Sequence, residues 1–459
     1  MKITVLNGSP KGDLSVTLQY INFIQKKYPE IEICVHHVAQ KIKAIEKNEA
    51  KFQEIMADVA SSDAVWWSTP IYVFLVPSQY IRFIELISER GAGDSFKNKY
   101  TAVFCTSIHF YDHTGINFMH ASCDDLEMKF VDFFSSDMYD LTQDESQERL
   151  LSFAGQFFST VEKCDPVPRV FQPLKRREFS YLPGPSGKPI DLQGKRVLLL
   201  ADRQEEGSNL EEMIQRFLGS FSSTVERINL SDVGIKGGCL GCVQCAFDNE
   251  CVYQDKDGYI EFYRQKVTTA DIFVCASDLT GRYLSSAWKQ FYDRRFFNTH
   301  IPTMAGKQIA FIISGPLSQI ANLREVLNAS VEMDHANLAG IVTDEFGDSA
   351  AVDSLLDRLA EKSVGLSEKG FVKPETFLGV SGRKVFRDAV WGRMRFPFLA
   401  DHKFYTENGY YDFPQEDTEA LEFSLEMIEA VKDPETREEI RKSLKSSMVE
   451  SLKHIVETR

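Results

Sequence analysis

The chain has 459 residues, too many for one ordinary core, which predicts two or three domains. Its formal net charge of −15 argues against nucleic acid as a partner, because nucleic-acid binders usually carry a basic face. The chain has nine cysteines, an odd number, and its first residues resemble a strand, which predicts a cytoplasmic protein with reduced thiols. No apolar run reaches about 18 residues, so no membrane partner is expected.

The first part of the chain predicts a parallel α/β sheet. Short apolar runs at 3–7 (ITVLN), 64–69 (AVWWST) and 101–107 (TAVFCTS) are typical of buried strands, and segments with helical period separate them. Parallel sheets of this kind bind ligands outside the carboxyl ends of their strands. The functional residues are therefore expected in the loops that follow these three strands.

The loop after the first strand has the residues of an anion site. It reads NGSPKGDLSVT (7–17) and places the hydroxyls of Ser9, Ser15 and Thr17 before a predicted helix. A helix N-terminus favours an anion through its unpaired N–H groups and its dipole. The pattern is neither a Walker A loop nor GxGxxG. Phosphate binding and a simple capped turn both remain open, since the two use the same residues.

Two further strand ends carry aromatic and polar residues, TPIY (69–72) and TSIHFYDH (106–113). Tyr111, Asp112 and His113 could relay protons, whereas Asp112 could equally cap the helix that follows. Spacing alone does not separate the two interpretations. An anion turn followed by two such loops is typical of a flavodoxin-like fold that holds flavin mononucleotide (FMN).

The strand pattern then repeats. Residues 165–194 contain six of the sixteen prolines and predict an extended linker between a domain at 1–164 and a second α/β domain at 195–370. The second domain has strand-like runs at 196–201, 272–277 and 308–314.

The second domain has a poorer anion turn. Glu205 and Glu206 precede Gly207, Ser208 and Asn209, and two carboxylates beside a phosphate are unfavourable. The loop after its second strand has no TPxY sequence. We therefore expect a weaker flavin site in this half, and whether it binds FMN at all stays open.

Four cysteines lie close together in the second domain. The stretch GGCLGCVQCAFDNEC (237–251) has the spacing CxxCxxCx5C, with Cys239, Cys242, Cys245 and Cys251. Its glycines allow a tight loop, and four thiolates suit a [4Fe-4S] cubane, since structural zinc prefers ligand pairs separated by a dozen or more residues. Zinc and uncommitted thiols remain alternatives. Cys34, Cys105 and Cys275 lie in apolar runs and are expected to be small core residues.

The last part, 371–459, predicts a mainly helical extension. The stretch 384–413 is rich in aromatic and basic residues and is expected either to dock on the preceding domains or to line a substrate pocket. Apolar residues at helical spacing then predict two amphipathic helices, broken at Pro434.

The turn at 7–17 followed by TPIY resembles the NADPH-dependent FMN reductases, and CxxCxxCx5C ahead of ADIFVCAS resembles the iron-sulfur flavoproteins within that group. The resemblance covers roughly 1–160 and 195–345 and implies two tandem flavodoxin-like, doubly wound parallel sheets. It implies NAD(P)H as a donor, a [4Fe-4S] cluster on the four clustered cysteines, and FMN in the three loops. The residues expected at FMN are Ser9, Lys11, Ser15, Val16, Thr17, Pro70, Ile71, Tyr72, Thr106, Ser107 and His109.

Family members are expected to pair so that the cluster of one subunit lies near the flavin of another, and this chain would contain both partners. A homodimer remains open. The expected function is a flavin-dependent oxidoreductase that passes electrons between NAD(P)H or a reduced carrier, FMN and the cluster, to a partner protein or a small-molecule acceptor. The alternatives are a non-catalytic electron carrier and a flavoprotein with structural zinc. No catalytic residue is predicted.

Overall fold

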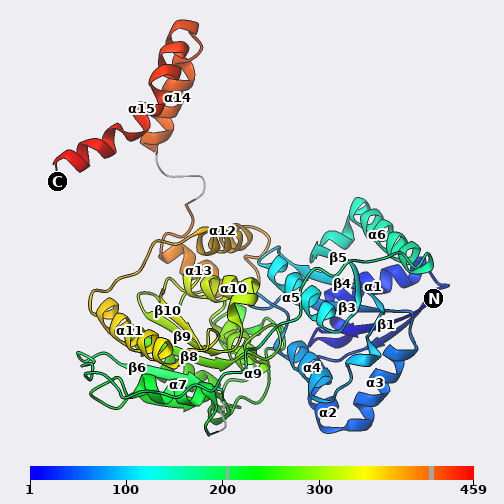
Figure 1. Cartoon of the computed structure of the whole chain (residues 1–459). Helices are drawn as coiled ribbons and strands as arrows, with labels where there is room; N and C mark the ends of the chain where they lie inside the picture. The colour runs from blue at the N-terminus through cyan, green and yellow to red at the C-terminus, as the bar shows by residue number, and fades with distance from the viewer. Residues whose placement is uncertain (203–205, 413–417, 459) are drawn as a thin grey trace. The chain divides into compact units, whose positions relative to one another are not determined.

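The computed structural model describes residues 1–202, 206–412 and 418–458. The chain divides into two compact units, Met1–Phe404 and Tyr405–Arg459. The larger unit contains two five-stranded parallel sheets (Figure 1). It also includes residues 371–404, which the sequence had grouped with the C-terminal extension.

The first sheet has the strand order β2-β1-β3-β4-β5, which is the flavodoxin-like 2-1-3-4-5 order. All its neighbouring strands are parallel. The strands are β1 (Lys2–Asn7), β2 (Glu32–His36), β3 (Ala64–Pro70), β4 (Tyr100–Ser107) and β5 (Lys129–Asp137). The helices of this half are α1 (Val16–Lys27), α2 (Ile42–Lys47), α3 (Glu49–Ser61), α4 (Ser78–Glu89), α5 (Asp112–Asp125) and α6 (Asp144–Glu162).

The second sheet repeats this order, as β7-β6-β8-β9-β10. Its strands are β6 (Val197–Ala201), β7 (Glu226–Asn229), β8 (Ile272–Asp278), β9 (Gln308–Ser314) and β10 (Asn337–Thr343). Its helices are α7 (Asn209–Leu218), α8 (Tyr259–Phe262), α9 (Ser286–Arg294), α10 (Ala321–Glu332) and α11 (Ser349–Glu368). The prediction of two tandem flavodoxin-like sheets is confirmed. Residues 165–194 connect them without a helix or an extended strand.

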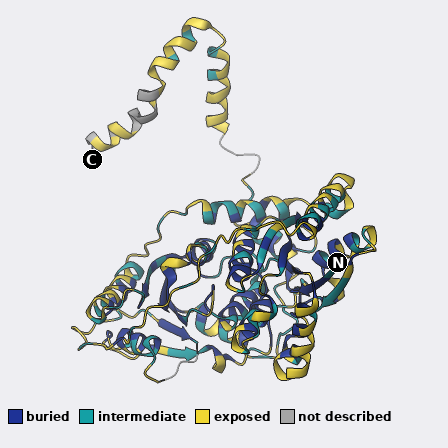
Figure 2. Ribbon diagram, turned by 45° about the vertical axis from the view of Figure 1, so that its right-hand side comes forward, coloured by how far each residue is buried: buried dark blue, intermediate teal, exposed yellow. Residues whose placement is uncertain are grey.

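The central strands are apolar because helices cover both faces of each sheet. β3, β4, β8 and β9 are buried almost along their whole length, whereas the outer faces of the surrounding helices are exposed (Figure 2). The edge strands β2 and β7 have half-buried residues. This contrast explains why the sequence pattern revealed the central strands and not the edge strands.

The two halves pack through α4 and α9. The Asp293 carboxylate accepts a hydrogen bond from Ser78 N at 2.7 Å, and Lys289 Nζ donates to the Tyr72 carbonyl at 2.7 Å. Lys289 also pairs with Asp293, and both side chains are fully buried. A buried charge needs such partners, so this contact fixes the relative position of the two halves.

Residues 371–404 pack on both halves. In α12 (Phe377–Trp391), the Leu378 carbonyl accepts a hydrogen bond from Tyr111 Oη at 2.6 Å. Thr376, just before α12, donates from its N–H to Glu332 of the second half at 2.8 Å. α13 (Leu399–Glu407) follows. Within the aromatic stretch 384–413, the Phe386 ring lies 4.5 Å from the Phe110 ring of the first half and 3.5 Å from the His300 ring of the second, so this part docks as predicted.

The smaller unit contains α14 (Thr418–Ala430) and α15 (Pro434–Thr458). Pro434 is the first residue of α15, a position that tolerates proline because its missing N–H would be unpaired there anyway. The predicted pair of helices is therefore present. Among the described residues, no helix has the length and apolar character needed to cross a lipid bilayer.

Candidate functional site

A cavity of about 240 Å³ lies at the carboxyl ends of β1, β3 and β4. It brings together ten of the eleven residues predicted to contact FMN, namely Ser9, Lys11, Ser15, Val16, Thr17, Pro70, Ile71, Tyr72, Thr106 and Ser107. His109 departs from the prediction. It is exposed and bonded to Asp112, and its neighbours Ile108 and Phe110 line the cavity instead.

The turn after β1 is organised by a buried asparagine. Asn7 Oδ1 accepts a hydrogen bond from Ser9 N at 3.1 Å, and Asn7 Nδ2 donates to the Gly12 carbonyl at 3.1 Å. Ser15 then caps α1, accepting from Leu18 N at 3.4 Å. These contacts leave the first turn of α1 facing the cavity, as an anion site requires.

The hydroxyls of this turn are held in place. Ser9, Ser15 and Thr17 are buried, and Thr17 Oγ1 lies 2.6 Å from Thr106 Oγ1 of the third loop. This hydrogen bond joins the start of α1 to the end of β4. Small buried hydroxyls at a helix N-terminus suit a phosphate.

One wall of the cavity comes from the cysteine loop of the second half. Cys239, Gly241 and Val243 line it, and the Cys239 carbonyl accepts a hydrogen bond from Gln79 Nε2 at 2.9 Å. A Cβ added to Gly241 would lie 1.7 Å from Tyr72 Oη. Only glycine permits this approach, so the cysteine loop and the loop after β3 are in direct contact.

The side chains between the cavity and the cysteines have shifted acidities. Burial lowers the pKa of the Lys11 ammonium, and the nearby Cys239 and Cys242 act in the opposite direction. Burial, with Cys239 as a further cause, raises the pKa of Tyr72 well above its usual value. Tyr72 Oη has no hydrogen-bond partner among the described residues. Both side chains therefore lie beside the cysteine loop.

All four clustered cysteines line one smaller cavity, which shares Cys239, Val243 and Phe296 with the larger one. Burial raises the pKa of Cys239 to about 12 and also raises that of Cys245. These two thiols are consequently protonated at neutral pH.

The larger cavity is also lined by His300, a residue that the sequence did not predict to be functional. His300 Nδ1 lies 2.8 Å from Asp401 Oδ2, and Asp401 Oδ1 accepts from His300 N at 3.0 Å and from Thr299 Oγ1 at 2.6 Å. The imidazole stacks on Phe386, with ring centroids 3.5 Å apart. Nε2 has no hydrogen-bond partner among the described residues. His300 is thus fixed on two sides, and its second ring nitrogen is left for a ligand.

No side-chain to side-chain hydrogen bond joins Tyr111, Asp112 and His113 among the described residues, although the Tyr111 and His113 rings stack with centroids 5.6 Å apart. Asp112 accepts hydrogen bonds from Ser135 Oγ at 2.7 Å and bonds to His109, whereas Tyr111 bonds to Leu378. His113 pairs with Glu325 at 2.7 Å. Asp112 is the first residue of α5 rather than its cap. Each of the three side chains therefore has a separate structural contact.

The corresponding edge of the second sheet is acidic and partly filled by the linker. A cavity of about 230 Å³ there includes Asp278, Asp344 and Glu345, and Arg176 of the linker pairs with Asp278 at 3.0 Å. Asn209 at the start of α7 donates to Asp344 at 2.7 Å. Glu205 lies outside the described residues. The polar groups of this edge mostly bond to one another.

Residues 1–115 match the family model of NADPH-dependent FMN reductase. The matched region contains the turn at 7–17 and the TPIY sequence that carried the resemblance to this family. No curated protein matches the chain.

The chain is also similar to solved structures over about a third of its length. The flavoenzyme NAD(P)H:(acceptor) oxidoreductase FerB from Paracoccus denitrificans has 18% identity and a TM-score of 0.30, with 35% of this chain and 97% of that one covered. General stress protein 14 from Treponema denticola, in complex with FMN, has 13% identity and a TM-score of 0.27, covering 35% and 98%. An azoreductase from Bacillus anthracis has 9% identity and a TM-score of 0.25, covering 36% and 99%.

The residues of the larger cavity fit FMN. The turn offers buried hydroxyls and a helix N-terminus to a phosphate, and Pro70, Ile71 and Tyr72 offer an apolar edge to a planar ring.

Proposed function

We propose that the chain is an NAD(P)H-dependent oxidoreductase in which the first half holds FMN and the second half supplies a [4Fe-4S] cluster at the same cavity. The observation that supports this proposal is a wall shared by the two cavities. Cys239 lines both the cavity of the flavin loops and the cavity of the four cysteines. FMN accepts two electrons as hydride and can release them singly, which would allow a cluster to receive them.

The spacing of the four thiols supports a cluster over zinc. Tetrahedral zinc with bonds of about 2.3 Å needs sulfur atoms about 3.8 Å apart. Among the described residues, the group of three metal-binding atoms within 4.8 Å of one another lies elsewhere in the chain, and the four cysteines do not form a second one. A cubane places its thiolates on separate iron atoms, so it suits sulfurs farther apart that surround one cavity.

The residues of the cavity have distinct roles in this proposal. Ser9, Ser15 and Thr17 bind the phosphate, and the loop of Pro70 and Tyr72 orients the ring. Phe386, Met394 and Phe398 line the same cavity and limit the access of water. Their apolar surface favours a planar organic acceptor such as a quinone.

His300 is the proton donor to that acceptor in this proposal. Asp401 accepts from Nδ1–H and stabilises the imidazolium form of His300, whose second proton is on Nε2 and would be the one transferred. A quinone takes up two electrons and two protons, and therefore needs such a donor.

The shared wall is tested by Gly241→Ala, with Gly281→Ala as its control. Both glycines have a left-handed backbone, with φ of +63° and +62°, so both variants carry similar backbone strain. Only the Cβ at position 241 meets Tyr72, since nothing lies within 4 Å of the one at position 281. We expect Gly241→Ala to slow cluster reduction by NADPH about tenfold or more, measured by anaerobic stopped-flow absorbance, with Gly281→Ala close to wild type. Equal rates in both variants would contradict a shared wall.

A further inference from the structure

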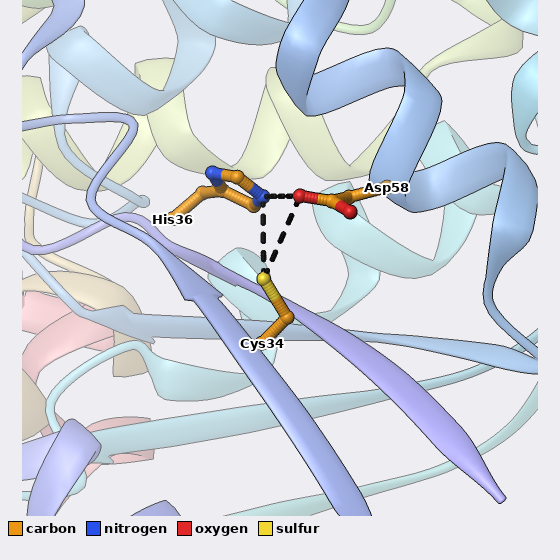
Figure 3. Close-up of side chains that lie close together, drawn as sticks. All are labelled: Cys34, His36 and Asp58. Atoms are coloured by element: carbon orange, nitrogen blue, oxygen red, sulfur yellow. Dashed lines mark hydrogen bonds and ion pairs between the residues drawn. The ribbon is translucent and has the colours of Figure 1, made fainter.

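A second group of metal-binding side chains comes from β2 and α3, and none of its residues lines the larger cavity. Figure 3 shows how these three side chains point toward one another. Cys34 Sγ is 3.6 Å from His36 Nε2 and 3.6 Å from Asp58 Oδ2, and His36 Nε2 is 2.9 Å from Asp58 Oδ2. The sequence predicted that Cys34 is a core residue. That prediction holds for Cys105 and Cys275, which are buried, but is wrong for Cys34, which is half-buried among polar atoms.

Local structure explains why these side chains meet. Cys34 and His36 are two residues apart on a strand, so both point to the same face of β2. Asp58, on α3, faces them, and its other oxygen, Oδ1, lies 3.4 Å from Lys2 Nζ of the neighbouring strand β1. Lys2 also donates to Ser61 Oγ at 2.8 Å. The lysine therefore orients the carboxylate and leaves Oδ2 directed at the thiol and the imidazole.

The arrangement is not that of an activated nucleophile. A relay would use the two ring nitrogens of His36 separately, one toward the thiol and one toward the carboxylate. Here the same atom, Nε2, contacts both groups. Burial and the neighbouring Asp58 also raise the pKa of the Cys34 thiol, which opposes formation of a free thiolate.

The distances instead match the ligand atoms of a tetrahedral metal site. Zinc bonds of about 2.3 Å to sulfur and about 2.0–2.1 Å to nitrogen and oxygen give S···N and S···O separations of about 3.6 Å and an N···O separation of about 3.4 Å. Two of the three separations agree with the structure, and the third opens by about half an ångström once a cation replaces the hydrogen bond. Exposed fractions of 16% for His36 and 32% for Asp58 leave an opening to solvent.

We propose that Cys34, His36 and Asp58 bind a borderline-soft divalent cation such as Zn²⁺, with water as the fourth ligand. Thiolate and imidazole ligands favour such an ion over Mg²⁺ or Ca²⁺. On binding, the Cys34 thiol loses its proton to solvent and neutral His36 gives its Nε2 lone pair. The cation joins the edge strand β2 to α3, and Lys2 holds the outer oxygen of the ligating carboxylate.

The test is the zinc content of the full chain after incubation with zinc chloride and gel filtration. Wild type, Cys34→Ser and the control Cys164→Ser are compared, because Cys164 is exposed and belongs to no such group among the described residues. We expect Cys34→Ser to hold about one zinc fewer per chain than the other two, whatever the four clustered cysteines bind. The comparison is thus independent of the proposed cluster. Zinc should also raise the melting temperature of wild type and Cys164→Ser more than that of Cys34→Ser.

His36→Gln provides a second variant that keeps the thiol, in case Cys34→Ser does not fold. Its zinc affinity should fall at least tenfold, since an amide is a poor replacement for imidazole. Equal zinc content and equal thermal shifts in wild type, Cys34→Ser and His36→Gln would overturn the proposal and leave a purely hydrogen-bonded cluster. No zinc retained by wild type beyond that of Cys34→Ser would overturn it equally.

Discussion

The two sheets share one strand order but differ at the edge where such folds bind ligands. After β1 the chain places Ser9, Ser15 and Thr17 around an apolar-walled cavity. After β6 it places the half-buried Asp202, followed at the next strand ends by Asp278 and Asp344. Fold alone therefore does not make a flavin site, because the chemistry depends on which side chains the strand-end loops carry.

The difference extends to what fills each edge. The linker inserts Arg176 at the second edge, where it pairs with Asp278. The first edge is instead enclosed by Cys239 and His300 from the second half and by Phe386 from α12. The second half thus contributes walls to the site of the first, and its own edge is held by internal ion pairs and hydrogen bonds.

The largest expected effect is the loss of the cluster. Replacing Cys239 with serine should abolish stoichiometric iron and acid-labile sulfide, because a cubane needs a ligand on each iron. FMN content should stay near that of wild type, since Cys239 contributes a wall rather than a phosphate contact. Metal and flavin analysis of anaerobically purified protein measures both. Cys275→Ser, a buried cysteine outside the group, is the control. Full iron content in Cys239→Ser would contradict the assignment of Cys239 as a cluster ligand.

Glutamate substitutions where α1 and α7 begin test the comparison directly. Thr17→Glu adds a charge and bulk where the phosphate is expected and should abolish FMN retention. Ser208→Glu makes the same change at the start of α7 in the second half and should leave FMN content unchanged. Flavin release after denaturation gives the stoichiometry, and far-ultraviolet circular dichroism checks folding. Thr17→Val, which removes only the hydroxyl, should weaken retention if Thr17→Glu does not fold. Loss of flavin in Ser208→Glu alone would reverse the assignment.

Substitution of His300 tests whether a residue of the second half donates a proton to an acceptor in the larger cavity. His300→Gln should lower kcat for a quinone about a hundredfold, because a positioned proton donor typically contributes that much. The rate with ferricyanide, which accepts an electron and no proton, should change little. Steady-state assays with the two acceptors separate a proton-transfer role from a general loss of structure. Equal losses with both acceptors would show that His300 only supports the cavity.

The smallest expected effect is on stability, through Asp202 at the carboxyl edge of the second sheet. Burial raises the pKa of Asp202 from 3.8 to about 7, partly offset by hydrogen bonds from Ser277 and Ser285. A raised folded-state pKa favours folding fully below about pH 4, and this contribution is lost as pH rises through about 7. Asp202→Asn should therefore stabilise the protein by about 1–3 kcal/mol at pH 8 and by much less at pH 5. Chemical denaturation at both pH values measures this, and an equal effect at both would contradict a buried titrating carboxylate.

The sequence predicted correctly those parts of the fold that depend on contiguous residues. The central strands are continuous apolar runs, and the turn at 7–17 is contiguous, so both could be recognised. β2, with Glu32 and His36, has too many polar residues for such a pattern. His300 and Asp401 are a hundred residues apart along the chain and meet only through packing of α12 and α13. No local signal distinguished them, although the aromatic stretch indicated that this region docks.

The central claim is that one chain holds one flavin in its first half and one cluster in its second. The most direct test is FMN, iron and acid-labile sulfide per chain in protein purified without oxygen. The account predicts about one FMN with about four iron and four sulfide atoms. About two FMN per chain, or stoichiometric zinc at Cys239, Cys242, Cys245 and Cys251 without sulfide, would contradict it.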